Sequence, residues 1–207
     1  MGLYADKMKT VLYGLANRPF IPEELRGSKR RLILHISDTP SDIYPFLYQV
    51  VEQLNPLDLI HTGDLADNYK IEFQKFHLSH YQRAVSSFVH HLQEISEARL
   101  HIVLGNHDDP DTLAAILPGF PMQARCIELN GRLFYVMHKL DKLPQKPGYY
   151  CFGHRFEPAN EETRKYVLLN GLLNLNVIDV DTWQVFHLEY PVGTNGYRKM
   201  TKGRIGL

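Results

Sequence analysis

Apolar residues in the first half of the chain fall into short continuous runs separated by longer stretches with helical spacing. The runs at 32–37, 58–61 and 100–104 are typical of strands buried on both faces of a parallel sheet. The stretches at 43–54 and 71–98 have helical spacing and predict two helices, the first capped by Ser41 or Asp42. Strand and helix in alternation predict an α/β domain with a parallel sheet.

After Pro118 the pattern changes to short segments typical of β structure. Asn130-Gly131 and Asp181-Thr182 are typical hairpin turns and indicate antiparallel neighbours. The expected strands cover residues 125–129, 132–137, 149–152, 166–169, 173–179 and 183–189. The second half therefore predicts further β structure rather than a continuation of the strand and helix alternation.

The chain divides into three parts along the sequence. Residues 1–31 are expected to form an added amino-terminal helix and a linker, residues 32–190 the domain itself, and residues 191–207 a basic, loosely held carboxyl-terminal tail. A length of 207 residues with 44% apolar content is sufficient for one domain with a sizeable core.

Charge and cysteine content narrow the classes of partner. Lysine and arginine number 23 and so do aspartate and glutamate, so no global field attracts nucleic acid or an anionic membrane, and no clear nucleic-acid patch is expected. No stretch approaches the roughly 20 apolar residues that span a bilayer. Cys126 and Cys151 lack the spacing of paired ligands. We therefore predict a cytoplasmic protein, and a neutral surface is compatible with a monomer or a dimer.

Polar side chains that can bind metal follow the predicted strands. Asp38, Asp64 and Asn106 each come just after one of the three apolar runs, where open α/β sheets build their ligand crevices. His138 and His154 follow strands of the second half. Oxygen ligands mixed with imidazole suit manganese, iron, zinc or nickel. A carboxylate such as that of Asp64 could bridge two ions about 3.5 to 4 Å apart.

Taken together, these segments resemble the signature of the calcineurin-like metallophosphoesterases, from about residue 32 to 189. The matching segments, in the family's order, are Asp38-Thr39-Pro40, Gly63-Asp64, Gly105-Asn106-His107-Asp108, His138 and Gly153-His154. The resemblance implies a four-layer αββα sandwich, with two mixed central sheets flanked by helices and a metal site at their edge. It also implies that Asp64 bridges the ions and that Asn106, His138 and His154 complete the second metal site.

Two further residues carry a catalytic role by this resemblance. His107 is similar to the histidine that stabilises the transition state or protonates the leaving oxygen, and Asp67 is similar to the carboxylate that orients it. Together they are expected to form an acid dyad. The segment from Asn68 to Ala98 is expected to be an insertion near the site that could cap it and select the substrate.

The first metal site departs from the family pattern at two positions. Asp-x-His reads Asp38-Thr39-Pro40, and Gly-His-x-His reads Gly153-His154-Arg155-Phe156, so both missing histidines belong to the same ion. We expect one well-bound divalent ion, most fittingly Mn²⁺, and a second ion that binds weakly or not at all, with Asp38 as its remaining ligand. Asp42 could substitute as a ligand, or only cap a helix. Arg155 could instead present a permanent positive charge to a substrate phosphate.

Two functions of different classes follow. The first is a metal-dependent hydrolase of phosphomonoesters or phosphodiesters that uses a metal-bound hydroxide and a reduced first site. The alternative is a catalytically weak or inactive binding or scaffold module, for which the retromer scaffold subunit is a precedent in the family. Retention of Asp67 and His107 favours the enzyme, whereas an apolar face on the amino-terminal helix would favour the scaffold. His35 and His61 are interpreted as core histidines, and those of the 71–98 helix as surface residues.

Overall fold

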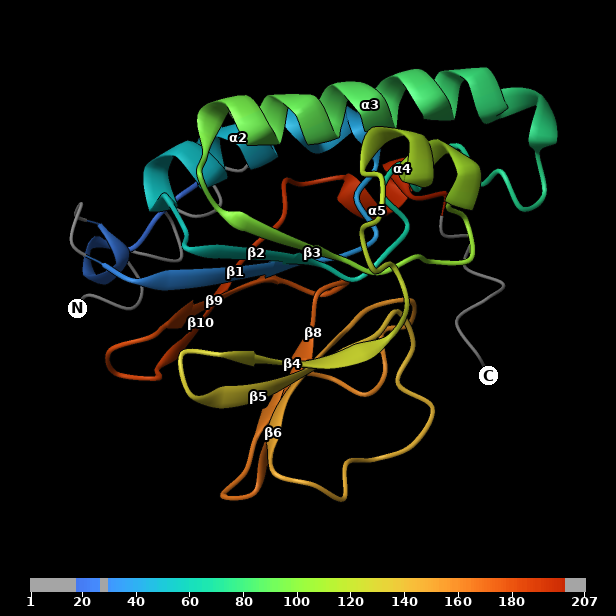
Figure 1. The fold of residues 1–207 in the computed structure, drawn as a ribbon. Coiled ribbons are helices and arrows are strands. Elements are labelled where there is room, and N and C mark those ends of the chain that lie inside the picture. Colours follow the sequence, from blue (N-terminus) through green and yellow to red (C-terminus); the bar gives the residue numbers. More distant parts are fainter. Residues whose placement is uncertain (1–17, 27–29, 200–207) are drawn as a thin grey trace.

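The first sheet is built around the parallel strands predicted from the amino-terminal half. A computed structural model describes residues 18–26 and 30–199 of the chain (Figure 1). The first sheet has the order β10-β9-β1-β2-β3, in which β1, β2 and β3 run parallel and β9 and β10 pair antiparallel. Its strands are β1 Leu32–Ile36, β2 Asp58–His61, β3 Arg99–Ile102, β9 Leu175–Asp179 and β10 Val185–Leu188. The carboxyl ends of β1, β2 and β3 therefore lie at one edge.

The second sheet comes from the second half of the chain, as expected. It has the order β4-β5-β6-β8-β7 and mixes parallel with antiparallel pairs. The hairpins predicted at Asn130-Gly131 and Asp181-Thr182 join β4 to β5 and β9 to β10. The strands are β4 Arg125–Leu129, β5 Arg132–Val136, β6 Gly148–Phe152, β7 Glu161–Glu162 and β8 Tyr166–Asn170.

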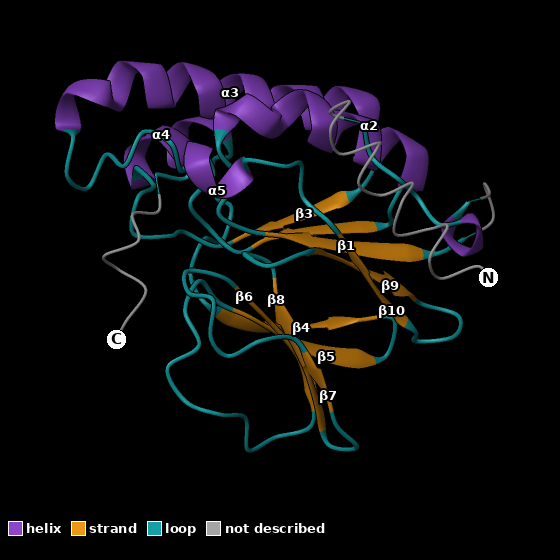
Figure 2. Ribbon diagram, turned by 180° about the vertical axis from the view of Figure 1, so that it is seen from behind, coloured by secondary structure: helices purple, strands orange, loops and turns teal. Residues whose placement is uncertain are grey.

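The described helices lie on the side of the first sheet, where α2 and α3 pack on its outer face (Figure 2). They are η1 Glu23–Leu25, η2 Ser41–Ile43, α2 Tyr44–Leu54, η3 Lys75–His77, α3 Leu78–Ile95, α4 Pro110–Ile116 and α5 Thr194–Tyr197. Buried Val85, Phe88 and Leu92 recur at helical spacing on α3. The helix predicted over 71–98 is thus shorter. It belongs to the core of the domain, so the predicted cap over Asn68–Ala98 is wrong for most of its length.

The alternation of side chains in β1 explains its continuous apolar sequence. Leu32 and Leu34 point into the core under the helices, whereas Ile33 points into the core between the two sheets. On the other side of that second core lie Phe134 and Cys151 from the second sheet. The predicted sandwich of two mixed sheets with flanking helices is confirmed, and in the described part of the chain these helices lie on the side of the first sheet (Figure 1).

Several local details differ from the sequence expectations. Neither Ser41 nor Asp42 caps α2, because Ser41 is bonded to Asn68 instead and no side chain caps this helix. The short helix α4 was not predicted, although Asp109 caps it through a 2.9 Å bond from the Thr112 N–H. A helix of seven residues gives too short a periodic pattern to recognise.

Described residues near both ends of the chain pack against the domain more than expected. The helix predicted for residues 3–16 lies outside the described residues. Ile21 and Leu25 of the predicted linker are buried in the core under the helices. Residues of the predicted tail pack as well, since α5 is followed by Arg198, whose side chain is 1% exposed. The tail is therefore not loosely held as far as residue 199.

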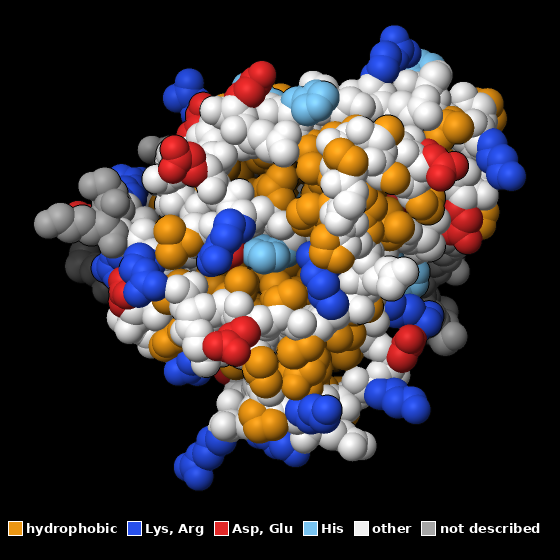
Figure 3. All heavy atoms as spheres, viewed as in Figure 1, with side chains coloured by type: hydrophobic (Ala, Val, Ile, Leu, Met, Phe, Trp, Pro, Cys, Tyr) orange, Lys and Arg blue, Asp and Glu red, His pale blue; other side chains and the backbone are white. Residues whose placement is uncertain are grey.

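One face of the molecule carries charged and hydrophobic side chains together (Figure 3). Figure 3 shows acidic and basic side chains interspersed on one face, with hydrophobic side chains gathered near its middle. None of the helices within 18–26 and 30–199 is long and apolar enough to span a bilayer.

The stability of the sandwich should depend on β1. Leu34 is fully buried, so Leu34→Ala should lower the free energy of unfolding by about 2–5 kcal/mol, as expected for a buried leucine. Leu57 is 39% exposed, and Leu57→Ala should cost less than about 1 kcal/mol. Urea unfolding followed by circular dichroism compares the two, and equal losses would contradict the layer arrangement.

Candidate metal centre

The loops after β1 and β2 hold two buried aspartates in the left-handed backbone region. Asp38 has a φ of 51° and Asp64 a φ of 56°, a conformation that aspartate tolerates better than most residues. The loops are tied together because Asp38 N–H donates to Gly63 O at 2.9 Å and Thr39 N–H donates to Asp64 O at 3.0 Å. The backbone thus fixes where both carboxylates lie.

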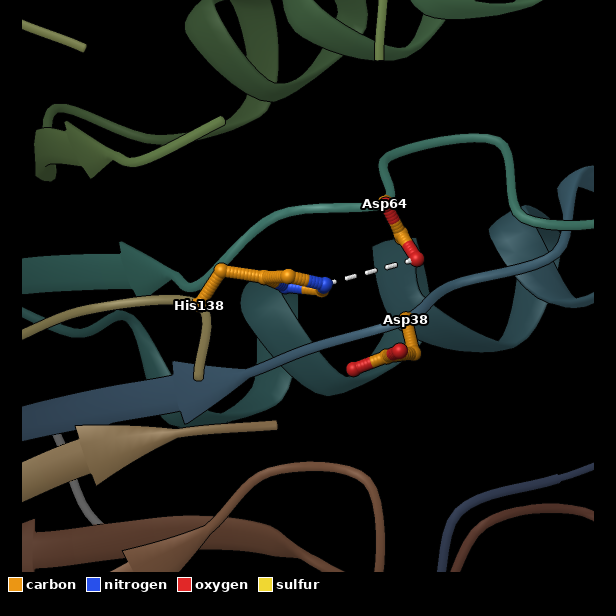
Figure 4. Close-up of side chains that lie close together, drawn as sticks. All are labelled: Asp38, Asp64 and His138. Atoms are coloured by element: carbon orange, nitrogen blue, oxygen red, sulfur yellow. Dashed lines mark ion pairs between the residues drawn. The ribbon is translucent and has the colours of Figure 1, made fainter. Parts of the chain in front are cut away.

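The candidate ligand atoms converge on one space. The carboxylates of Asp38 and Asp64 and the imidazole of His138 each offer an atom within 4.8 Å of the others (Figure 4). His138 Nε2 is 3.6 Å from Asp64 Oδ2, 3.1 Å from Asn106 Oδ1 and 3.1 Å from His154 Nδ1. All five predicted metal ligands are therefore neighbours, and their role as ligands stays a prediction.

Neighbouring groups orient two of these side chains for metal binding. His138 Nδ1 lies 2.7 Å from Thr62 O, a carbonyl that can only accept, so Nδ1 carries a proton and the Nε2 lone pair faces the site. Asn106 Nδ2 donates to Glu72 Oε2 at 2.7 Å, which turns Oδ1 toward His138. This donor set fits a divalent ion. Glu72 was not identified from the sequence, because a single acidic residue before a helix carries no pattern.

The positions of the missing histidines are used differently. Pro40, at the first of these positions, is buried just before η2, and its carbonyl accepts a 3.1 Å bond from the Ile43 N–H. Phe156 lines a cavity of about 190 Å³ beside Tyr190 and Arg198. Of the residues matched to the first site, only Asp38 and Asp64 keep a side chain that can bind an ion.

Two further candidate residues are exposed. Asp42 is exposed on η2 and is absent from both groups of possible metal ligands in the described part of the chain. Arg155 is exposed, and its backbone carbonyl accepts a 2.8 Å bond from Asn170 Nδ2. Its predicted contact with phosphate stays a prediction.

The predicted dyad has the geometry of a hydrogen-bonded pair. His107 Nδ1 is 2.8 Å from Asp67 Oδ1 and 2.9 Å from Asp64 Oδ2. Burial acts to lower the pKa of His107, but its bonds to the two carboxylates raise this pKa to about 9. Its Nε2 is buried without a hydrogen-bond partner among the described residues, although Glu72 Oε2 lies 3.4 Å away. A buried, protonated Nε2 is suited to meet an oxygen of a ligand.

The charges of the buried groups depend on one another. Burial raises the pKa of Asp38 to about 6, and the charge of Asp64 acts in the same direction. Burial also acts to raise the pKa of Asp64, but the bonds from His107 and the charge of His138 outweigh it and hold this pKa below its usual value. Burial acts to lower the pKa of His138, whereas the charges of Asp64 and Asp38 raise it on balance.

Two histidines excluded on sequence grounds are core residues. Burial lowers the pKa of His35 and of His61 to about 3, so both are neutral. His35 Nε2 is 3.0 Å from Thr62 Oγ1, and His61 Nδ1 accepts a 3.2 Å bond from Gly63 N–H.

Asp108 organises the loops around the site, a role that the sequence did not reveal. Its carboxylate accepts bonds from the backbone N–H groups of Asp64, Leu65 and Gly105 at 2.7 to 2.8 Å. The hydroxyl of Tyr81 adds a fourth bond of 2.9 Å. Its position at the end of the motif Gly105-Asn106-His107-Asp108 is the sequence feature that could have pointed to this role.

Arg198 is a second residue that sequence reasoning missed. Its guanidinium donates to the backbone carbonyls of Asp38 at 2.7 Å and Leu172 at 2.8 Å. Its charge acts to lower the pKa of Asp38, against the larger effect of burial. A lone arginine in a basic segment gives no signal of burial.

Comparison with known proteins identifies the class defined by this fold and site. The sequence profile described as Calcineurin-like phosphoesterase matches residues 31–201. The chain belongs to the calcineurin-like phosphoesterase family, as its motifs predicted, and this family supports a metal-dependent phosphoester hydrolase in general terms.

Three solved structures align with the chain at low sequence identity. One aligns with a TM-score of 0.52 at 14% identity, covering 78% of this chain and 99% of that chain. YfcE, a phosphoesterase from E. coli, aligns at 0.48 with 14% identity over 77% of this chain and 99% of its own. Vacuolar Protein Sorting 29 from Cryptosporidium parvum aligns at 0.43 with 17% identity over 76% and 95%. No curated protein sequence matches the chain.

Replacing Asp108 should test how the loops are held. Asp108→Asn keeps the shape but turns an amide donor toward backbone donors, so it should lower the free energy of unfolding by about 2–4 kcal/mol. Asp111→Asn, at an exposed position of α4, should change it by less than about 0.5 kcal/mol. Urea denaturation measures both, and a neutral Asp108→Asn would refute the organising role.

Proposed function

We propose that the chain hydrolyses phosphate esters, either monoesters or diesters, with a divalent ion held by Asp64, Asn106, His138 and His154. Mn²⁺ is the most fitting ion for this mixture of oxygen and imidazole ligands. Asp38 would contribute a weaker ligand to a first site that binds its ion weakly or not at all. The observation that carries the proposal is the convergence of three prospective ligand atoms within 3.6 Å of His138 Nε2.

When bound, the ion would act as a Lewis acid on a phosphate oxygen and lower the pKa of a coordinated water. His107 would donate the proton at Nε2 to the departing ester oxygen. Its pKa of about 9 keeps it protonated at neutral pH, because Asp64 and Asp67 bond to Nδ1. Asp67 would fix the ring orientation, and Lys70 Nζ is bonded to the same Asp67 oxygen as His107 Nδ1.

A binding or scaffold module is the second candidate. Pro40 and Phe156 support it, because they stand where the first-site histidines would be and neither side chain can bind a metal ion. The buried His107 and Asp67 pair argues for the enzyme, since a scaffold has no physical need of an acid dyad. A cytoplasmic location stays a prediction from the sequence.

The direct test is hydrolysis of chromogenic phosphomonoesters and phosphodiesters with Mn²⁺. His107→Ala should retain metal but lose about 10²- to 10⁴-fold in kcat, as expected for loss of a general acid. Asn106→Ala should lose both metal and turnover, and His90→Ala, exposed on α3, should lose neither. Metal content is counted in every variant. Wild-type protein with no turnover would favour the scaffold.

Metal binding should weaken as the pH falls. A protonated His138 cannot bind an ion, and its pKa is raised, so protons compete with the metal in the neutral range and more strongly below it. Bound Mn²⁺ after equilibrium dialysis should therefore be lower at pH 5.5 than at pH 7.5, and activity should fall below about pH 6. Unchanged occupancy between the two would count against His138 as a ligand.

A further inference from the structure

A turn at residues 70–74 borders the candidate site and is attached to it at several points. Lys70 Nζ is bonded to Asp67 and lies 3.3 Å from His107 Nδ1. Glu72 Oε2 accepts the 2.7 Å bond from Asn106 Nδ2. Between them, Ile71 is buried in the core that α3 shares with α4. Lys70 thus ties the turn to Asp67 of the dyad, and Glu72 ties it to Asn106.

Phe73 occupies the exposed side of this turn. Its backbone N–H donates to Lys70 O at 3.0 Å. Its ring meets that of His107 edge-on, with centroids 5.8 Å apart and planes at 62°. Nevertheless 60% of the Phe73 side chain is exposed. A large aromatic surface is therefore held against the proposed proton donor while it stays accessible to a ligand.

We propose that Phe73 determines specificity by receiving a planar aromatic leaving group, either an aryl group or a nucleoside. This inference rests on the proposed function. In that reaction water adds to phosphorus and the bond from phosphorus to the ester oxygen breaks, with its electron pair moving to that oxygen. His107 Nε2 supplies the proton to the oxygen, and the proton that water loses passes to His107 and restores its protonated form.

The geometry beside His107 supports an aromatic group rather than a charged one. The leaving oxygen must approach Nε2, so the group attached to it lies beside the His107 ring, where Phe73 stands. Glu72 Oε2 lies 3.4 Å from the same Nε2. Its negative charge would disfavour a further phosphate at this position. Stacking on Phe73 would favour a flat, uncharged group.

Phe76 supplies a matched control. It is also exposed, at 77%, but its ring lies 4.2 Å from that of His77 instead of contacting His107. Phe73→Leu and Phe76→Leu remove similar exposed aromatic surface from the same segment. Neither change removes a buried side chain, so both variants should fold.

The test compares three monoesters with both variants: phenyl phosphate, adenosine monophosphate and propyl phosphate. Phe73→Leu should raise KM for an aromatic ester about five- to tenfold, the size expected for loss of an aromatic contact, and change propyl phosphate less than about twofold. Phe76→Leu should change all three less than about twofold. A larger change in KM for phenyl phosphate would indicate an aryl leaving group, and a larger change for adenosine monophosphate would indicate a nucleoside.

An equal change for all three esters, or no change, would overturn the role of Phe73. The non-hydrolysable phenylphosphonate and propylphosphonate measure the same preference by calorimetry in the presence of Mn²⁺. A protein that binds phenylphosphonate through Phe73 without turning over esters would contradict the proposed hydrolysis but retain the aromatic site. Turnover of the esters without a preference for aromatic ones would support the proposed hydrolysis and overturn the aromatic site.

Discussion

The central physical constraint in this structure is the burial of two carboxylates beside each other. Asp38 and Asp64 are both almost inaccessible, and each offers an oxygen within 4.8 Å of the same His138 nitrogen. Buried like charges are costly unless cations or hydrogen bonds compensate them. The protein provides the His107 imidazole, backbone N–H groups and the Arg198 guanidinium nearby. A divalent ion would complete this compensation and give the cluster a function.

The sequence predicted the fold well where one periodic pattern dominated. Leu32 to Ile36 is apolar on both faces because one face meets helices and the other meets the second sheet. The short helix α4 and the two-residue strand β7 were missed, since each is too short for a pattern to accumulate. Ser41 was assigned to a cap because local sequence does not reveal its distant partner Asn68.

The candidate site was predictable where residues lie in motifs and follow strands. Asp38, Asp64 and Asn106 come together because β1, β2 and β3 are parallel and neighbours. The groups that orient them come from elsewhere. Glu72, Asp108 and Arg198 act through hydrogen bonds to residues that are distant in the sequence, which no periodic pattern reports. The packing of α5 and Arg198 against the domain was missed for the same reason.

In the proposed metal centre, the residues matched to the two ions offer unequal sets of donors. Phe156 lines a cavity together with Arg198, while His138 Nε2 lies near Asn106, His154 and Asp64. The most direct test is the number of Mn²⁺ ions bound per chain, measured by isothermal titration calorimetry. We predict one tightly bound ion that His138→Ala abolishes. Two tightly bound ions, or one ion that survives this substitution, would contradict the account.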